Sequence, residues 1–479
     1  MNPLLELSAV ELAAKIRARE VSPVEVVETH VRRIEEVNGR LNAVVRPLFS
    51  AAHVEARAAE RRLAAREADL PPFLGVPFTS KEHLEVRGLP NTGGLVRRRN
   101  VVAPRDATVV ARMKEAGFVL LGTTNVPEGL TWYECYNKVY GRTSNAYSAR
   151  HTPGGSSGGE GAIIGAGGSP IGLGGDMGGS IRLPAFFNGI AGHKPSGGRM
   201  PETGAWPGAR GLIARYKVLG PMARRVSDLR AVMPILARPD GKDLSVDGPS
   251  WAEESLAPRD VRVFFFDDNG VMRPSAGVSS AVRESAAALG RLGCAVEPWR
   301  PTHLERGFQM WANALAQSGG PKFNDVIADG GELDLLREWL RWPVRRSAHT
   351  FPVLALAALE KAIAKAPKWG KQMADLRHEM LREIEAKLGP NGVLVCPVFH
   401  RAAPRHGLHA MLHFLGFTYS GTFNPLELPS TAVPTGFDDG LPVGVQVLGA
   451  RNRDIVTLSV AGWIEQIFGG WRPPWRLSA

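Results

Sequence analysis

The sequence has few cysteines and lacks a long apolar run. Its 479 residues include three cysteines, Cys135, Cys294 and Cys396, which lie far apart and form no C-x-x-C pair. This usage argues against a disulfide framework and favours a reducing compartment. The first twenty residues mix Glu and Lys among their apolar positions. We therefore expect neither a signal peptide nor a membrane-spanning helix there, and we expect a cytoplasmic protein.

Motifs for a metal or a nucleotide cofactor are also lacking. There is no H-E-x-x-H, and the cluster His400, His406, His409 and His413 has no Cys or carboxylate at zinc spacing. Neither G-x-G-x-x-G nor G-x-x-x-x-G-K-[ST] can be placed within residues 154–180. We expect no cofactor and no bound metal.

The basic excess does not take the form of a nucleic-acid site. The net charge is +11, from 58 Lys and Arg against 47 Asp and Glu, which by itself would suit an anionic partner. However, the arginines are spread along the chain, and no basic run is interleaved with aromatic residues. We therefore expect no nucleic-acid partner.

The pattern of elements indicates an α/β fold with a large mixed central sheet covered by helices on both faces. Ser8-x-x-Glu11 is a capping box, and Ser22-Pro23 begins a second helix. Helices and short apolar runs then alternate. The expected helices lie near residues 51–68, 106–117, 279–292 and 454–468, and the expected strands near 74–80, 118–121, 261–266, 393–396 and 443–448. No linker or repeat divides the chain, so residues 1–479 are expected to form one domain.

Residues 304–388 differ from the rest of this pattern. They are mostly helical in periodicity and rich in basic residues and tryptophan, including Trp311, Trp339 and Trp342. We interpret the interval as a variable helical insertion that caps the domain. Basic helices with Trp and Leu can lie on a membrane surface, although such residues more often pack against the body or a partner subunit.

The most unusual stretch is glycine-saturated and holds two serine sites. It contains Gly-Gly-Ser156-Ser157-Gly-Gly and, further on, Gly178-Gly179-Ser180. Ser156 fits the spelling of a G-x-S-x-G nucleophile elbow, but such an elbow needs a buried strand before it. Residues 145–153 are polar and turn-like. The elbow interpretation is therefore rejected, and both serines remain candidates beside Lys81, which ends an apolar run.

At this point the chain closely resembles the amidase signature family. The resemblance is densest over residues 74–236, its signature core, and returns at 418–449. The matching segments are Gly75-Val-Pro-Phe-Thr-Ser-Lys-Glu82, Gly122-Thr-Thr-Asn125, Gly154-Gly-Ser-Ser-Gly-Gly159, Gly174-Gly-Asp-Met-Gly-Gly-Ser-Ile-Arg182, Gly189-Ile-Ala-Gly-His-Lys-Pro195 and Gly220-Pro-Met-Ala-Arg224. Trp132-Tyr-Glu134, Pro184-Ala-Phe-Phe-Asn-Gly189 and Phe468-Gly-Gly-Trp471 look most like the fatty acid amide hydrolase 2 branch.

The resemblance implies a Ser-cisSer-Lys triad. Ser180 matches the nucleophile, Ser156 the bridging serine that follows a cis peptide bond, and Lys81 the base. A serine is a weak nucleophile until a base takes its proton, and burial would lower the pKa of Lys81 so that it could be that base. Ser156 would pass the proton between the other two.

The same resemblance assigns supporting roles. The amides of Met177, Gly178, Gly179 and Ser180 would form the oxyanion hole. Ser157, Asp176 and Arg182 would brace the site, and Leu130, Trp132 and Tyr133 would contact the substrate. Many relatives carry Thr or Ser at position 175 and Thr or Ile at 177, whereas this chain has Gly175 and Met177. Only the backbone of Met177 is needed, but any hydrogen bond from the side chain at 175 is lost.

Plainer interpretations of the aromatic residues stay open. Trp132 and Tyr133 suit a hydrophobic core as well as an acyl pocket. Phe414, Phe417 and Tyr419 suit either a channel wall or the apolar face of a helix.

The predicted activity is hydrolysis of a carboxylic amide, with fatty acyl or other lipid-like amides suggested by the branch. Alternatives with the same triad are an aryl or short-acyl amidase and an esterase. An amidotransferase subunit that hydrolyses glutamine for a partner is an alternative from another class, and a non-enzymatic binding protein is a third. The expected partners are a small amide substrate, a homodimer mate by resemblance, and a membrane touched through residues 304–388.

Overall fold

The fold is built on one large mixed sheet. A computed structural model describes residues 1–363 and 367–477 of the chain. Eleven strands follow the order β1-β3-β2-β6-β8-β7-β12-β13-β11-β9-β10, and β4 and β5 form a separate hairpin. The strands are β1 Val44–Pro47, β2 Pro77–Lys81, β3 Val119–Thr124, β4 Tyr136–Asn137, β5 Gly141–Arg142, β6 Ile171–Asp176, β7 Ala191–Lys194, β8 Val218–Ala223, β9 Arg262–Phe265, β10 Ala295–Pro298, β11 Gly392–Pro397, β12 Ser430–Asp438 and β13 Leu441–Gly449.

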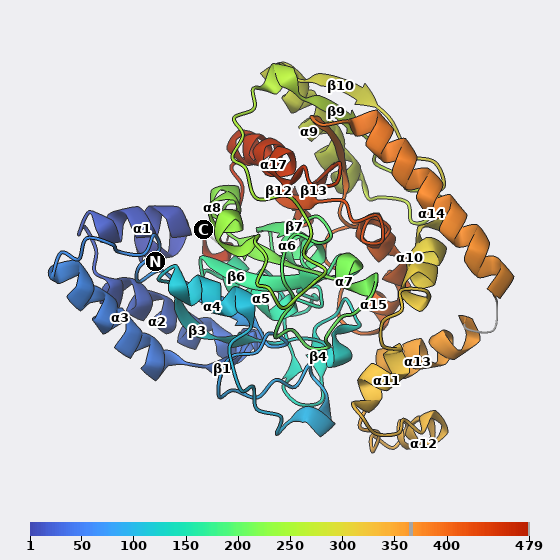
Figure 1. Cartoon of the computed structure of the whole chain (residues 1–479), viewed down its shortest axis with the longest axis horizontal. Helices are drawn as coiled ribbons and strands as arrows, with labels where there is room; N and C mark the ends of the chain where they lie inside the picture. Colours follow the sequence, from blue (N-terminus) through green and yellow to red (C-terminus); the bar gives the residue numbers. More distant parts are fainter. Residues whose placement is uncertain (364–366, 478–479) are drawn as a thin grey trace.

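Helices flank this sheet (Figure 1). The α-helices are α1 Ala9–Arg17, α2 Pro23–Leu41, α3 Phe49–Ala64, α4 Thr108–Glu115, α5 Gly158–Gly165, α6 Arg182–Phe187, α7 Ile213–Tyr216, α8 Val226–Leu236, α9 Ala276–Leu292, α10 Gly307–Ala316, α11 Phe323–Ala328, α12 Leu335–Arg341, α13 Phe351–Ile363, α14 Pro367–Leu388, α15 Leu408–Leu412, α16 Thr418–Gly421 and α17 Asp454–Phe468. The predicted mixed α/β class is confirmed.

The local signals at the N-terminus act as expected. Ser8 and Glu11 form the reciprocal capping box of α1, and the Ser22 side chain accepts a hydrogen bond from the amide of Glu25 at the start of α2. Each cap satisfies amides that a helix start leaves without an acceptor. Predicted boundaries move by a few residues, so that the strand expected at 74–80 begins at Pro77 and includes Lys81.

The two ends of the chain meet. The N and C marks lie near each other in Figure 1. Glu6 accepts hydrogen bonds from the indole of Trp475 and the guanidinium of Arg476. The first and last described segments of the chain are therefore packed side by side.

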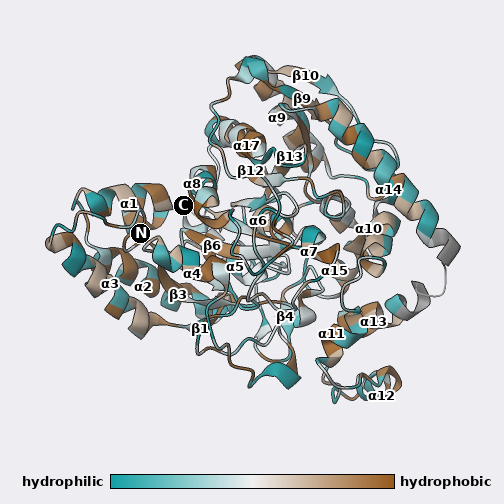
Figure 2. Ribbon diagram, in the orientation of Figure 1, coloured by the Kyte–Doolittle hydropathy of each residue, from teal (hydrophilic) through white to brown (hydrophobic). Residues whose placement is uncertain are grey.

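Residues 304–388 contain α10 to α14 and lie at one side of the molecule (Figure 1); we call them the helical segment, of which residues 364–366 lie outside the described residues. Its outer helix α14 is largely hydrophilic on the face shown in Figure 2. The predicted helical character is present, whereas the division into one domain with an inserted cap stays a prediction.

The glycine-rich stretch is packed rather than flexible. Every residue of α5 is buried, and a β-carbon at Gly159 would lie 2.4 Å from the amide nitrogen of Asn125 and 2.8 Å from the carbonyl oxygen of Ala43. These are backbone atoms that cannot turn away. Glycine is required here because another chain segment occupies the space of a side chain.

We predict that Gly159→Ala lowers the thermal unfolding midpoint, because the added methyl group overpacks a site closed by backbone, at a cost of about 1–3 kcal/mol or more. The matched control is Gly39→Ala in α2, where a β-carbon would meet nothing within 4 Å and should stabilise the helix by roughly 0.5–1 kcal/mol. Equal midpoints for the two variants in scanning calorimetry would contradict this packing.

Candidate active site

The ends of two neighbouring strands bring the candidate residues together. Strands β2 and β6 pair in parallel, with Thr79 opposite Gly172 and Ser80 opposite Leu173. Parallel neighbours end at the same edge of a sheet. Lys81 at the end of β2 and Asp176 at the end of β6 therefore lie at a common edge, and Ser180 follows in the turn between β6 and α6.

The first predicted contact at this edge is between Lys81 and Ser156. The peptide bond between Gly155 and Ser156 is cis. The Lys81 Nζ donates to Ser156 Oγ at 2.8 Å and to the carbonyl oxygen of Gly175 at 3.2 Å. Both side chains are buried, with 1% of Lys81 and 3% of Ser156 exposed, while Ser180 is partly exposed. The amine is thus held inside the protein, and Ser180 can be reached from outside.

Ser157 fixes the two serine loops to each other. Its amide donates to the carbonyl oxygen of Ser180 at 3.1 Å. Its hydroxyl lies 3.3 Å from both the amide and the carbonyl of Gly175 on β6. A shift of the Ser156 loop would therefore also break the contacts that place Ser180.

Burial determines the protonation of the lysine. Desolvation disfavours the ammonium form and lowers the pKa of Lys81 to about 7, while the nearby Asp176 carboxylate acts in the opposite direction. A lysine with its ordinary pKa of 10.5 is almost fully charged at neutral pH. Here a large fraction of the amine is neutral and able to accept a proton.

A buried carboxyl group near Lys81 was not singled out from the sequence. Glu160 on α5 accepts hydrogen bonds from the hydroxyls of Thr79 at 2.6 Å and Thr124 at 2.8 Å. Burial raises the pKa of Glu160 to about 8. The group is therefore mainly neutral at pH 7 and adds little negative charge that would favour the ammonium form of Lys81.

The turn that carries Ser180 is built around a buried ion pair. Asp176 and Arg182 have fully buried side chains and form two hydrogen bonds of 3.0 Å. Burial alone would raise the pKa of Asp176, but the Arg182 guanidinium holds that pKa below its ordinary value. Arg182 also donates to Ser420 O, Gln446 and Asn424. These contacts join the turn to α16 and β13, which are far away in sequence.

The backbone amides of this turn divide into two groups. The Gly179 amide donates to Asp176 Oδ1 at 2.7 Å. Among the residues that the structure describes, the amides of Met177, Gly178 and Ser180 have no hydrogen-bond acceptor. Three of the four amides predicted for an oxyanion hole are therefore available to a ligand, and the fourth supports the turn.

Aromatic side chains from separate parts of the chain pack together beside this turn; we call them the aromatic wall. Its members are Trp132, Phe308, Trp311, Phe414 and Phe417. Trp132 stacks on Phe414 with ring centroids 5.1 Å apart, and Trp311 meets Phe417 edge to face at 5.1 Å. A β-carbon at Gly178 would lie 3.4 Å from the Trp311 ring. The wall therefore adjoins the turn and is a candidate apolar surface for a substrate.

The other two predicted substrate contacts differ in character. Tyr133 is buried, its ring packs near Phe399, and its hydroxyl donates to the Ala410 carbonyl. This position is that of a core residue. Leu130 ends a 3-10 helix, Glu128–Leu130, with a positive φ of 61° and is partly exposed.

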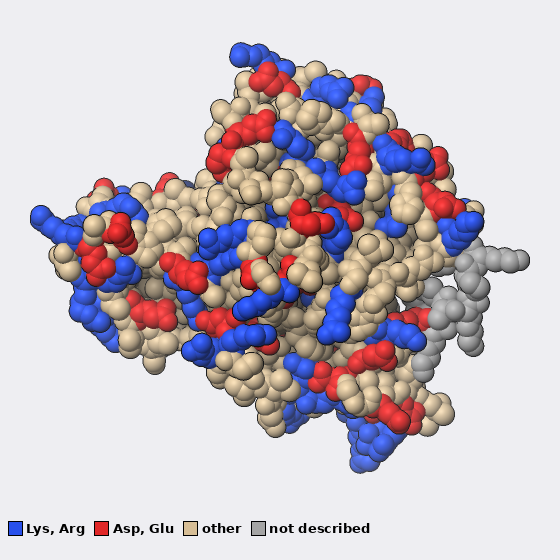
Figure 3. All heavy atoms as spheres, in the orientation of Figure 1, with Lys and Arg blue, Asp and Glu red and all other residues tan. Residues whose placement is uncertain are grey.

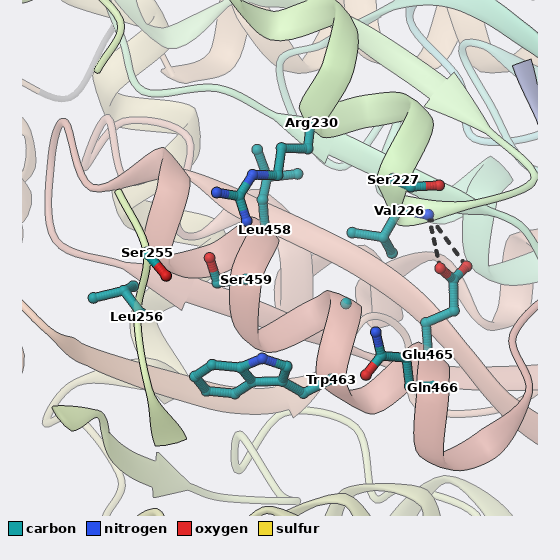
Figure 4. Close-up of a pocket in the computed structure, with 11 residues that line it drawn as sticks. Val226, Ser227, Arg230, Ser255, Leu256, Leu458, Ser459, Trp463, Glu465 and Gln466 are labelled. Carbon is teal, nitrogen blue, oxygen red and sulfur yellow. Dashed lines mark hydrogen bonds between the residues drawn. The ribbon is translucent and has the colours of Figure 1, made fainter. Parts of the chain in front are cut away.

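A pocket of about 250 Å³ lies elsewhere, between α8 and α17 (Figure 4). Arg230, Ser459 and Trp463 are among its lining residues, and none of the predicted site residues is. The carboxylate of Glu465 accepts hydrogen bonds there from the amide of Val226. This pocket is separate from the Lys81 site.

Within residues 1–363 and 367–477, no three His, Cys, Asp or Glu side chains come together as a metal site. Over the same ranges, no helix has both the length and the apolar character needed to cross a bilayer.

A serine at a strand-to-helix turn, a second serine and a buried lysine, set in this mixed sheet, define a class of serine-dependent hydrolases. The chain belongs to the amidase family, whose model, described as Amidase, matches residues 25–458. It is an amide-hydrolysing enzyme, and the predicted membership of the amidase signature family is confirmed.

Relatives resemble the chain over nearly its whole length. Human fatty-acid amide hydrolase 2 is 36% identical over 99% of this chain and 91% of its own. Indoleacetamide hydrolase of Bradyrhizobium diazoefficiens is 30% identical over 98% and 88% of the two chains. Among solved structures, 6-aminohexanoate cyclic dimer hydrolase superimposes with a TM-score of 0.80 at 27% identity, over all of both chains.

The lowered pKa of Lys81 predicts the pH dependence of any reaction that uses this amine as the base. Below about pH 7 the amine is protonated, so the rate at which a fluorophosphonate labels the protein should fall roughly tenfold per pH unit. Above that value the rate should level off. Stopped-flow or gel-based labelling between pH 5 and 9 checks this, with circular dichroism to verify folding at each pH; a flat profile would contradict it.

Proposed function

We propose that the chain hydrolyses amides of carboxylic acids with a fatty acyl or other long apolar group, through an acyl-enzyme on Ser180. The observation that supports this most directly is the 2.8 Å bond from the buried Lys81 amine to Ser156, beside the turn that carries Ser180. The similarity to a fatty-acid amide hydrolase and the aromatic wall support the acyl preference.

In the proposed first step, the Ser180 hydroxyl attacks the substrate carbonyl carbon. Its proton passes to Ser156, whose own proton passes to the neutral amine of Lys81. The negative charge that forms on the carbonyl oxygen is stabilised by the three available amides, those of Met177, Gly178 and Ser180. Gly179 supports the same turn through Asp176.

The second half of the cycle returns the protons. As the C–N bond breaks, Ser156 gives a proton to the leaving amine and recovers one from Lys81. Water then attacks the acyl carbon and loses a proton along the same path. The acid leaves, and Ser180 regains its proton.

Further parts of the proposal concern the protein's surroundings. We propose contact with a membrane through the helical segment, whose helix α12 exposes Leu336 and Leu340. Acidic and basic side chains are interspersed on the face shown in Figure 3.

A cytoplasmic location is proposed from three unpaired, buried cysteines. A homodimer is proposed from the family resemblance.

Covalent labelling tests the nucleophile. We predict that one equivalent of a fluorophosphonate attaches to Ser180, and that Ser180→Ala abolishes both labelling and amide hydrolysis because no other hydroxyl occupies the turn. Ser280→Ala, which changes an exposed serine on α9, is the control. Peptide mass spectrometry identifies the site, and a label on Ser156 would refute this assignment.

A series of amides with one amine and graded acyl groups tests the substrate class. We predict that kcat/KM rises with chain length, by up to about fourfold per CH2 group while each is buried, which corresponds to ~0.8 kcal/mol. Phe414→Ala should flatten this rise, because it removes the partner of Trp132. Phe437→Ala, which removes a ring that pairs with Tyr147 instead, should leave it unchanged.

An optimum at acetyl groups would favour the short-acyl alternative, and an optimum at aryl groups the aromatic one. Ammonia release from glutamine in the same assay would favour an amidotransferase subunit. Faster hydrolysis of matched esters than of amides would identify an esterase.

A further inference from the structure

Trp311 makes a polar contact that its place in the aromatic wall does not require. Its indole Nε1 donates to the carbonyl oxygen of Met177 at 2.8 Å. Trp311 lies on α10 in the helical segment, and Met177 is the first residue of the turn that follows β6. The helical segment thus reaches the backbone that would bind the oxyanion.

The geometry of a peptide unit gives this contact a consequence. The carbonyl of Met177 and the amide of Gly178 belong to one planar trans peptide, in which C=O and N–H point in opposite directions. Fixing the carbonyl therefore fixes the direction of the amide. Trp311 holds the oxygen from one side, and the Gly178 N–H, which has no acceptor among the described residues, is directed to the other.

The other two available amides are fixed by the same device. The carbonyl of Asp176, which shares a peptide with the Met177 amide, accepts from Asn424 Nδ2 at 3.2 Å. The carbonyl of Gly179, which shares a peptide with the Ser180 amide, accepts from the Leu183 amide at 2.7 Å. Asn424 and Leu183 lie outside the helical segment. The Gly178 amide differs from them, because its peptide is held by Trp311 of the helical segment.

The packing of α10 supports a fixed position for Trp311. Gly307 at the start of α10 lies so close to Thr422 that a β-carbon would be 2.1 Å from its hydroxyl oxygen. Thr422 is two residues from Asn424, the anchor of the neighbouring peptide. The Trp311 ring is also held by Phe417 at 5.1 Å and lies 3.4 Å from the position of a Gly178 β-carbon.

From these contacts we infer that Trp311 is a positioning residue for the oxyanion hole: its N–H orients the Met177–Gly178 peptide so that the Gly178 amide faces the reacting carbonyl. The inference rests on the proposed function. It couples the helical segment to the rate of the chemical step, because the ring that borders the acyl group also sets one oxyanion donor.

The decisive change is Trp311→Phe, which removes the N–H and keeps an aromatic ring. Removal of one oxyanion donor costs roughly 100- to 1,000-fold in kcat, so a misdirected donor should cost at least about tenfold. We expect that loss in kcat, with KM within about threefold of the parent value. Binding of a trifluoromethyl ketone, which forms an anionic adduct with serine, should weaken by a similar factor, while binding of the carboxylic acid product should not.

Two further variants separate this role from wall packing. Phe414→Leu alters the wall at a ring that pairs with Trp132, Phe308 and Phe417 and keeps the Trp311 N–H, and should raise KM with little effect on kcat. Benzothienylalanine at position 311 keeps the shape of tryptophan without the N–H, and should reproduce the kcat loss even if Trp311→Phe folds poorly.

The outcomes distinguish the two levels of the proposal. If Ser180 is labelled by a fluorophosphonate and both position-311 variants retain the parent kcat, Trp311 is only part of the wall and the inference is wrong. If the parent protein is not labelled at Ser180, the proposed function itself fails. A rise in KM alone for the position-311 variants would also overturn the positioning role.

Discussion

The buried ion pair between Asp176 and Arg182 is the interaction on which the site depends. Both side chains are fully buried, so each would be costly to bury without the other. Asp176 also accepts from the amides of Gly179 and Ile181, and Arg182 extends to Asn424 and Ser420. The pair thereby closes the turn around Ser180 and attaches it to segments some 240 residues later in the chain. The backbone amides of Met177, Gly178 and Ser180 can stay without an acceptor because the buried ion pair, rather than these amides, stabilises the turn.

The sequence predicted the α/β class and several elements, because those elements carry local signals. The caps at Ser8 and Ser22 and the periodicity of α17 are examples. Strand β6, with the sequence Ile-Gly-Leu-Gly-Gly-Asp, was not predicted, since glycine is rare in strands. At Gly172 the glycine leaves room for the Glu160 carboxyl group, whose oxygen would lie 1.9 Å from a β-carbon. Such a requirement arises from tertiary packing and cannot be seen in a local pattern.

The site residues likewise differ in whether a local sequence signal or tertiary packing determines them. Family motifs pointed to Lys81, Ser156 and Ser180, and the structure brings Lys81 against Ser156 at the edge where the Ser180 turn begins; their roles remain proposals. The use of the Gly179 amide by Asp176 was not predicted, because a motif does not show which amides are already bonded. Trp311 was noted only as one of several tryptophans in a helical interval. Its contact spans 134 residues, and no spacing rule in the sequence connects such positions.

The aromatic wall is assembled from parts of the chain that do not supply the triad. Its rings come from residues 132, 308–311 and 414–417, whereas Lys81, Ser156 and Ser180 come from β2 and from the loops before α5 and α6. Around α5 an added methyl group would meet backbone, so that region admits little variation. The wall is made of side chains on a loop, which carries Trp132, and on two short helices, where one substitution reshapes the surface without moving the lysine. At wall positions other than Trp311, whose N–H contacts the Met177 carbonyl, mutation can therefore change the accepted substrates while the lysine and serines keep their places, and gene duplication on this scaffold would yield enzymes that differ more in substrate than in reaction.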